Sequence, residues 1–400
     1  MVKYVLLFKC TAEVIFVMEH TVGLYDTHKY RHNVIAFAKK NTVLIIAILL
    51  AVVTSFIVKP DAEYIGYFDF KTLTCLFCTL AVVCALKNIN FFTVTARKIV
   101  QITGNTRSAV TALAYVTFIG SMIIANDMAL ITFLPLGYFV LYSTGKDKYM
   151  AFTFIIQNIS ANLGGMLTPF GNPQNLYLYS KFNIPTNEFF SIMFLPFALS
   201  VALITLCCIV FVKKEPMSIN KSEPIKLNPK KTVLYIVLFA YSIAIVFRTI
   251  PYWTGLAVIP AVLFFADKKA LKDVDYALLF TFVSFFIFAG NMARIDAVNR
   301  ILSELLNKNT LVVSALSCQV ISNVPSAILL SQFTDNYAEL LMGVNIGGTG
   351  TLIASLASLI TLREYTKYNK GKTKKYIGLF SAFNFGFLAI LLVFCSLIKH

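Results

Sequence analysis

Two short segments of this 400-residue chain combine asparagine, paired glycines and threonine in the same order. Residues 162–168 read NLGGMLT and residues 345–351 read NIGGTGT, so four of seven positions are identical, and both segments interrupt apolar runs. Paired glycines favour a break in a helix. A break frees backbone N–H groups that attract anions and carbonyl groups that coordinate cations. The two segments therefore predict an ion-binding site formed by unwound backbone.

The first segment continues into the polar run TPFGNPQN, residues 168–175. Its two prolines and its glycine cannot continue a helix, so we expect a polar, unwound stretch. In the second half, Thr349 and Thr351 supply hydroxyl groups. Ser355 and Ser358 follow them at helical spacing, and we expect these two to bond back to their own helix.

A further asparagine precedes each segment, in the middle of an apolar run too long or too broken for one crossing. Asn126 lies within residues 108–142, and Asn323 lies within residues 309–333, where Pro325 breaks the helix. Asp127 is the only acidic residue in the middle of an apolar run. A central aspartate costs about 2.5–3.5 kcal/mol on insertion scales and is usually functional. We expect Asp127 to bind a coupling cation or carry a proton, although capping of a helix is the simpler alternative.

These patterns define a set of predicted binding residues in which Asp127 couples the ion, and a Na⁺ ion is expected near Asn126, Asp127 and Asn323. The expected ligands of the substrate are Asn126, Asn162, Gly164, Gly165, Thr168, Pro169, Gly171, Asn172, Pro173, Gln174, Asn175, Ser322, Asn323, Pro325, Asn345, Gly347, Gly348, Thr349 and Thr351.

The composition places these residues in a membrane. Hydrophobic residues make up 58% of the chain and charged residues 14%, whereas soluble domains have about 45–50% and about 25%. A soluble enzyme and a disordered regulator are therefore excluded. The net charge of +16 lies in short loops between apolar runs, which indicates topology and not nucleic-acid binding.

Loop charge predicts the orientation of the chain. Basic residues dominate residues 1–41, residues 213–231 with six lysines, and residues 363–375 with five lysines and one arginine. Since positive loops stay in the cytoplasm, all three face inward only if residues 108–142 and 309–333 each enter and leave on the same side. We expect a multi-pass protein of the plasma membrane with a cytoplasmic N-terminus and an external C-terminus.

The order of hairpin and interrupted helix occurs twice, which predicts an all-α membrane protein of two inverted-topology repeats. The first repeat spans 42–212 (hairpin 108–142, broken helix 149–180), and the second spans 252–398 (hairpin 309–333, broken helix 338–362). Residues 1–41 form a cytoplasmic extension, and residues 213–251 form a loop and linker helix. Paired interruptions in two halves mark the substrate site of secondary transporters. Helix packing through small residues is the simpler explanation of a single Gly-Gly pair.

Other functions fit the residues less well. An intramembrane aspartyl protease needs two embedded aspartates, and only Asp127 is available. The four histidines, at 20, 28, 32 and 400, lie outside the main apolar runs, so an enzyme is not expected and neither is a cofactor. A passive channel also uses polar re-entrant loops, but the paired segments favour alternating access.

At these positions the sequence resembles the ion-transporter superfamily, and most closely the citrate-transporter-like domain of arsenite permeases, sodium/proton antiporters and di- and tricarboxylate carriers. The motifs GGMLTPFGNPQNLYLYS (164–180), SNVPSAILLSQFT (322–334) and GVNIGGTGTLIASLASLI (343–360) carry the resemblance. It implies re-entrant hairpins, substrate and coupling ions between hairpin tips and unwound segments, and an elevator-type homodimer.

The resemblance has two departures. Ser322-Asn323 matches the Ser-Asn-Thr hairpin motif of the dicarboxylate carriers, but Val324 replaces the threonine, and Ala125-Asn126-Asp127 replaces the whole motif in the first hairpin. A carboxylate there is less welcoming to a carboxylate substrate, which favours the arsenite-permease or cation/proton-antiporter branch. We expect a secondary transporter of a small carboxylate or oxyanion coupled to H⁺ or Na⁺, or alternatively a cation/proton antiporter.

Overall fold

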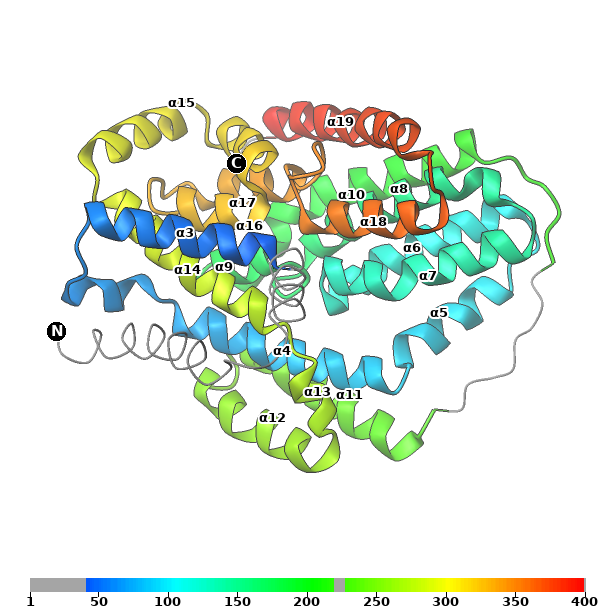
Figure 1. Ribbon diagram of the computed structural model, residues 1–400, viewed down its shortest axis with the longest axis horizontal. Coiled ribbons are helices and arrows are strands. Elements are labelled where there is room, and N and C mark those ends of the chain that lie inside the picture. The colour runs from blue at the N-terminus through cyan, green and yellow to red at the C-terminus, as the bar shows by residue number, and fades with distance from the viewer. Residues whose placement is uncertain (1–40, 219–226, 399–400) are drawn as a thin grey trace, which may run out of the picture.

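The computed structural model describes residues 41–218 and 227–398, and within these ranges the chain is helical without a β-strand. Most helices run roughly along the longest axis of the molecule (Figure 1). The prediction of an all-α protein is confirmed. The predicted extension, residues 1–41, lies outside the described residues except for Asn41. Part of the predicted loop 213–231 also lies outside the described residues.

Six helical stretches of the described chain are long and apolar enough to cross a membrane. They are α4 (Phe70–Asn88), α6 (Thr106–Ile124), α10 (Thr186–Phe211), α11 (Pro229–Val246), α13 with α14 (Lys268–Lys272 and Tyr276–Ala293) and α19 (Thr373–Leu397). Two shorter apolar helices, α3 (Thr42–Ile57) and α12 (Tyr252–Ala266), expose Phe56 at 81% and Phe265 at 86%. Large apolar side chains exposed in this way require lipid or another apolar surface.

Both predicted hairpins are pairs of helices joined by one residue in the same unusual conformation. In the first, α6 meets α7 (Asn126–Ser143) at Ala125, with φ 63° and ψ 153°. In the second, α15 (Asp296–Ile321) meets α16 (Asn323–Leu330) at Ser322, with φ 74° and ψ 160°. Non-glycine residues rarely occupy this region. Two turns of one geometry at corresponding places indicate that the halves share a local structure.

The kink inside α15 fixes where the second hairpin begins. Asn309 has φ −164° and ψ 89° inside the helix, and its side-chain oxygen accepts a hydrogen bond from the Val312 N–H at 3.0 Å. Asn309 therefore caps the hairpin arm. The residues before it form a separate helical section, at the position that α5 (Phe91–Gln101) has before the first hairpin.

Both Gly-Gly segments end a helix. The first broken helix consists of α8 (Met150–Gly164), the 3₁₀ turn η3 (Gly165–Leu167), an irregular stretch, and α9 (Pro173–Lys181). The second consists of α17 (Tyr337–Ile346), an unwound stretch of residues 347–355, and α18 (Leu356–Tyr368). Pro173 starts α9 as its first helical residue, where the missing N–H needs no partner.

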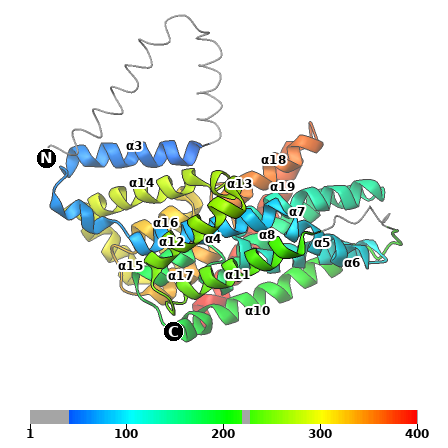
Figure 2. The ribbon, with the colours of Figure 1, turned by 90° about the horizontal axis from the view of Figure 1, so that it is seen from below.

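The contacts between helices divide them into two groups. Helices α3, α4, α11, α12, α13 and α14 form a group that we call the frame: α14 packs along α3, and α4 packs against α11, α12 and α13. The remaining helices carry the hairpins and the breaks. The two groups touch mainly where α14 meets α16 and α4 meets α9. Figure 2 places α3 and α10 at opposite faces of the molecule.

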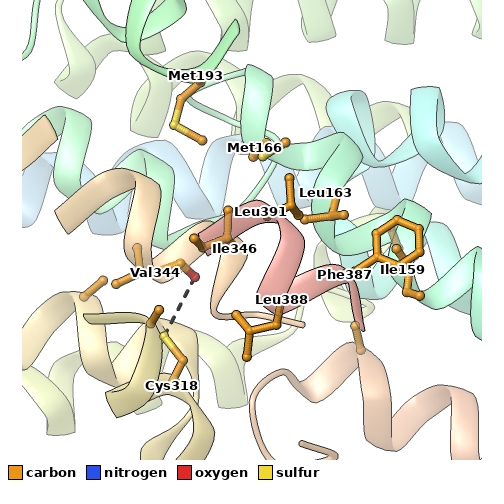
Figure 3. Close-up of a cluster of buried hydrophobic side chains, with 14 of the residues drawn as sticks. Ile159, Leu163, Met166, Met193, Cys318, Val344, Ile346, Phe387, Leu388 and Leu391 are labelled. Carbon is orange, nitrogen blue, oxygen red and sulfur yellow. Dashed lines mark hydrogen bonds between the residues drawn. The ribbon is translucent and has the colours of Figure 1, made fainter. Parts of the chain in front are cut away.

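An apolar cluster packs behind the two breaks (Figure 3). Phe387, Leu388 and Leu391 of α19 lie beside Leu163 of the first broken helix and Ile346 of the second. All five side chains are at most 6% exposed. Since interiors of this density resist deformation, the cluster holds the ends of α8 and α17 in fixed positions.

Candidate functional site

Asn162, at the end of α8, connects three of the four interrupted elements. Its side-chain oxygen accepts hydrogen bonds from Asn126 Nδ2 at 3.1 Å and Ser355 Oγ at 2.8 Å. Its backbone carbonyl accepts from Asn172 Nδ2 at 3.3 Å. Asn126 belongs to the first hairpin tip and Ser355 precedes α18, so one buried asparagine joins the first hairpin, the first break and the second break.

Asn345, the counterpart of Asn162, is the second centre of the network. Its Nδ2 donates to Asn175 Oδ1 at 2.6 Å and to the Leu341 carbonyl at 2.8 Å. Its Oδ1 accepts from Asn172 at 3.3 Å and Gln174 at 3.4 Å. We call Asn126, Asn162, Asn172, Gln174, Asn175, Asn345 and Ser355 the amide cluster. All of its members are at most 4% exposed.

The second hairpin tip is joined by a backbone hydrogen bond to Ala354, the residue before Ser355 of the cluster. The Asn323 N–H donates to the Ala354 carbonyl at 3.0 Å, directly before α18. Its side-chain oxygen accepts from the Val324 N–H at 2.9 Å, as the Asn126 oxygen accepts from the Asp127 N–H at 2.9 Å. A Cβ on Gly348 would lie 3.2 Å from Asn323 Nδ2. Both tips therefore present asparagines of the same geometry to the two breaks.

The first glycine of each pair permits close packing. A Cβ on Gly164 would collide with the Phe118 carbonyl and lie 2.6 Å from Ser121 Oγ, both on α6. A Cβ on Gly347 would lie 2.9 Å from Cα of Ala315 on α15. Each of these glycines lets a broken helix approach the arm of its own hairpin. The simpler explanation of the Gly-Gly pairs therefore holds for their first members.

Gly165, the second glycine of the first pair, and Gly171 of the polar run face the cluster instead. A Cβ on Gly165 would collide with Asn172 Oδ1, and one on Gly171 would collide with the Gly165 carbonyl. Neither position has room for a side chain, so the backbone of the first break lies directly against the Asn172 amide.

The side chains of the polar run after the first break mostly form hydrogen bonds with nearby backbone carbonyls. Asn175 Nδ2 donates to the carbonyls of Gly165, Met166 and Thr168 at 3.1–3.2 Å. Thr168 Oγ1 donates to the Met122 carbonyl of α6 at 2.8 Å. Pro169 lies between these contacts, in the stretch between η3 and α9. Asn175 thus satisfies carbonyls of the unwound stretch, and Thr168 satisfies a carbonyl in the last turn of α6.

Several predicted ligands of the second half lie outside the amide cluster. Thr351 Oγ1 donates to the Gln319 carbonyl at 3.0 Å, and Thr349 Oγ1 donates to the Ile346 carbonyl at 2.6 Å. Ser322 Oγ donates to the Ala354 carbonyl at 3.2 Å. Pro325 is buried in the first turn of α16. These residues shape the hairpin and the break, and none of these hydrogen bonds reaches Asn162 or Asn345.

Asp127 follows the first hairpin tip but makes no hydrogen bond or ion pair through its carboxylate with the described part of the chain. Its Oδ1 is buried. The Asp127 carboxylate does not cap α7 in the described structure; the Asp127 N–H instead donates to Asn126 Oδ1 at 2.9 Å.

Three further polar atoms of the cluster are buried and lack a partner among residues 41–218 and 227–398: Asn162 Nδ2, Asn172 Oδ1 and Gln174 Oε1. Buried polar atoms are nearly always hydrogen-bonded in folded proteins. One donor and two acceptors around the breaks, and the Asp127 oxygen next to Asn126, thus lack a partner among the described residues and are groups that an ion or its water could satisfy.

Sequence reasoning missed two polar partners, Gln319 and Asn158, and the long-range contacts of two serines. Gln319 Nε2 donates to the carbonyls of Gly347 and Thr349 at 2.9 and 3.0 Å, and its Oε1 accepts from the Thr351 N–H. The expectation that Ser358 bonds back to its own helix was wrong. For Ser355 it holds in part, because Ser355 Oγ accepts from the Ala357 N–H of α18 at 3.2 Å but donates outside that helix. Ser355 binds Asn162, and Ser358 accepts from Asn158 at 3.4 Å. These partners are some 30 to 200 residues away in sequence, so local spacing carries no signal for them.

The fold and this polar interior together define a class: a polytopic helical membrane protein with a buried polar site formed by interrupted helices, as found in transporters. The chain belongs to the citrate transporter family, whose model matches residues 33–344. The resemblance drawn from the Gly-Gly and Ser-Asn motifs is thereby confirmed.

Two relatives support the assignment. An uncharacterized transporter of Methanocaldococcus jannaschii is 34% identical over 296 residues, which are 74% of this chain and 81% of the relative. The inner membrane protein YbiR of Escherichia coli strain K12 is 28% identical over 303 residues, which are 74% of this chain and 80% of the relative. The function is therefore membrane transport.

Proposed function

We propose that this transporter is a secondary active carrier of a small anion, a carboxylate or an oxyanion such as arsenite, coupled to H⁺ or Na⁺. The observation that carries the proposal is the unpaired Nδ2 of Asn162 among helix N-termini in a buried cluster. An amide donor at this place suits an anion. The cluster contains no lysine or arginine, so amides and helix dipoles would provide the binding.

Helix ends supply the charge complementarity. The N-termini of α7, α9, α16 and α18 lie at Asn126, Pro173, Asn323 and Leu356, and each adjoins the amide cluster or its contacts. N-termini carry a partial positive charge and favour an anion. The C-termini of α6, α8, α15 and α17 lie at the same two tips and breaks. Their carbonyls favour a cation, which gives co-transport of opposite charges a physical basis.

The order of elements supports inverted repeats and alternating access. Each half has a span, a short helical section, a hairpin, a broken helix and a final span: α4 to α10, and α14 to α19. In Figure 1 the two hairpins approach the middle from opposite ends. This arrangement supports the repeats 42–212 and 252–398, re-entrant hairpins, and a cytoplasmic N-terminus with an external C-terminus in the plasma membrane. A homodimer remains a prediction of the resemblance.

Asp127 is the proposed coupling residue. Its carboxylate has no partner among residues 41–218 and 227–398, and it lies next to Asn126, which itself binds Asn162. Binding of H⁺ or Na⁺ to Asp127 would therefore alter the hairpin tip that closes on the cluster. If the cation alone moves, the same residue favours the second candidate, a cation/proton antiporter.

The test uses purified protein in proteoliposomes. A thermal-shift screen with citrate, succinate, sulfate, arsenite, Na⁺ and Li⁺ at two pH values first identifies ligands, because a ligand of the folded state stabilises it. Uptake of the stabilising anion is then measured under an H⁺ or Na⁺ gradient. We expect Asp127→Asn, which keeps the size of the side chain, to abolish gradient-driven uptake.

Asp69→Asn is the matched control, because Asp69 caps α4 through the Thr72 N–H at 2.9 Å and asparagine caps equally well. Unchanged coupled uptake in Asp127→Asn would remove Asp127 from the mechanism. Na⁺/H⁺ exchange without anion uptake would favour the antiporter. Single-channel conductance in a bilayer would contradict a carrier.

A further inference from the structure

A cavity of about 560 Å³ lies away from the amide cluster, where α4, α5, α7 and α13 meet. Its polar side includes Lys87 at the end of α4, Arg97 on α5 and Lys269 on α13. We call these three residues with the cavity the basic pocket. Three cations from three helices converge there, which concentrates positive charge at one place.

No acidic side chain of the described residues forms an ion pair with these cations. Neither Lys87, Arg97 nor Lys269 forms an ion pair with a residue of 41–218 or 227–398, and Arg97 Nε is buried without a hydrogen-bond partner there. An acid at the same end, Asp267, is otherwise engaged. Its carboxylate accepts from Asn88 Nδ2 at 3.2 Å and from the Ala270 N–H at 3.1 Å. A buried guanidinium nitrogen without a partner in the described residues, in a cavity that two exposed lysines also line, favours an anion.

The opposite wall of the basic pocket is apolar. Ile131, Pro135, Leu136 and Phe139 of α7 line it. Ile131 and Phe139 are each 44% exposed, although they are large apolar side chains. A small inorganic anion would leave this wall uncovered. A ligand with a charged end and an apolar body would satisfy both sides.

The depth of the basic pocket agrees with such a ligand. The candidate span α4 ends at Asn88, and Asn90, in the left-handed conformation with φ 59°, turns the chain into the amphipathic helix α5. The pocket therefore lies at the end of a span, where membrane proteins meet lipid headgroups. Lysine and arginine clusters at this depth attract anionic lipids.

We propose that the basic pocket binds an anionic phospholipid, with the phosphate held by Arg97, Lys87 and Lys269 and an acyl chain along α7. Lys87 and Lys269 belong to the frame, whereas the apolar wall belongs to the first hairpin. The lipid thus occupies the seam between the frame and the first hairpin. This inference does not depend on which substrate is transported.

The experiment measures the unfolding midpoint of the full chain in a neutral detergent, titrated with dioleoyl phosphatidylglycerol, dioleoyl phosphatidylcholine or inorganic phosphate. We expect a saturable rise of the midpoint with phosphatidylglycerol alone. Arg97→Gln and, independently, Lys269→Gln should each weaken the apparent affinity for phosphatidylglycerol by about fivefold or more. Lys98→Gln should not, because Lys98 is exposed on α5 and does not line the cavity.

The unfolding midpoints without lipid show whether each variant folds. Because the two variants lie on different helices, the proposal can still be tested if one of them does not fold. Equal phosphatidylglycerol affinities in the unmodified chain and both pocket variants would overturn the proposal. So would an equal rise with phosphatidylcholine, which would indicate acyl-chain binding alone. A saturable rise with inorganic phosphate that Arg97→Gln removes would assign the pocket to a soluble anion and overturn the lipid assignment.

Discussion

At the scale of residues, the two Asn-x-Gly-Gly segments divide packing and polar contact between neighbouring positions. Asn162 and Asn345 centre the hydrogen-bond network, while Gly164 and Gly347 let α8 and α17 approach the hairpin arms. The asparagines need the glycines, because only close packing against the hairpins brings Asn126 and Asn323 within reach.

We predict that Gly164→Ala destabilises the protein by about 1–3 kcal/mol, the usual cost of overpacking a tight interior. The added methyl would meet the Phe118 carbonyl, a backbone atom that cannot rotate away. The thermal unfolding midpoint in detergent measures this effect. Gly378→Ala is the control: Gly378 lies in α19 with nothing within 4 Å of an added Cβ. It should gain up to about 1 kcal/mol from lower chain entropy. Equal midpoints for both variants would contradict the packing role of Gly164.

At the scale of elements, a polar clamp outside the spans holds the base of the first hairpin. Glu215, which follows α10, binds Lys146 Nζ at 2.7 Å, Lys148 Nζ at 2.6 Å and the Tyr149 hydroxyl at 3.0 Å. Its carbonyl accepts from the Thr106 N–H at 2.9 Å. One residue therefore ties the start of α6, the turn η2 (Asp147–Tyr149) and the end of α10 together. The hydrogen bonds from Lys146 and Lys148 lower the pKa of Glu215 to about 2.

We predict a pH-dependent loss in Glu215→Gln. Because the pKa falls from an ordinary 4.5 to about 2 on folding, the clamp stabilises the folded state above about pH 4.5 and loses this effect as the pH falls towards 2. The variant should unfold at a lower midpoint than the unmodified chain at pH 7, and the gap should narrow below pH 4.5.

Glu364→Gln is the control for the clamp, since Glu364 pairs with Lys367 at 3.4 Å within a single helix. Such pairs contribute little, so its midpoint should stay near that of the unmodified chain. A gap for Glu215→Gln that is constant from pH 7 to pH 3 would show that the ionised clamp is not its cause.

At the scale of the whole molecule, the frame and the remaining helices meet mainly where α14 packs on α16 and α4 packs on α9, and each of the two apolar cores includes residues of both groups. Alternating access requires the amide cluster to meet water on each side in turn. The described conformation has Asn162 at 2% and Asn345 at 1% exposure. We therefore expect this conformation to be an occluded one, which opens when the frame and the other helices shift.

We predict that Asn162→Cys and Asn345→Cys react with a membrane-impermeant thiol reagent at rates that change with the coupling ion, H⁺ or Na⁺. Labelling of the unmodified chain provides the background from its own cysteines, of which Cys207 is the one half-buried thiol among the described residues. Ile159→Cys, on the same helix but in the apolar cluster of Figure 3, should stay unreactive. If both asparagine positions stay unreactive under every ionic condition, no permeation pathway passes through the cluster.

The sequence alone determined the membrane class, the family, and the two places where a helix must break. These features are local: hydropathy selects the bilayer as solvent, and closely spaced glycines and prolines favour a break in a helix. The turns at Ala125 and Ser322 lie at the predicted hairpin tips, next to the asparagines that mark them. The candidates Asn126, Asn162 and Asn345 were identified because a polar residue in an apolar run stands out.

Only the tertiary structure decided which of these residues meet. Asn162 accepts a hydrogen bond from Ser355, 193 positions away in sequence. Thr351 hydrogen-bonds to Gln319 and not to the cluster. The basic pocket likewise joins Lys87 to Lys269 across the frame. The physical reason is that a side chain of asparagine or serine can bond equally well with many partners. The packing of whole helices, which sums many small apolar contacts, selects the partner that lies within 3 Å.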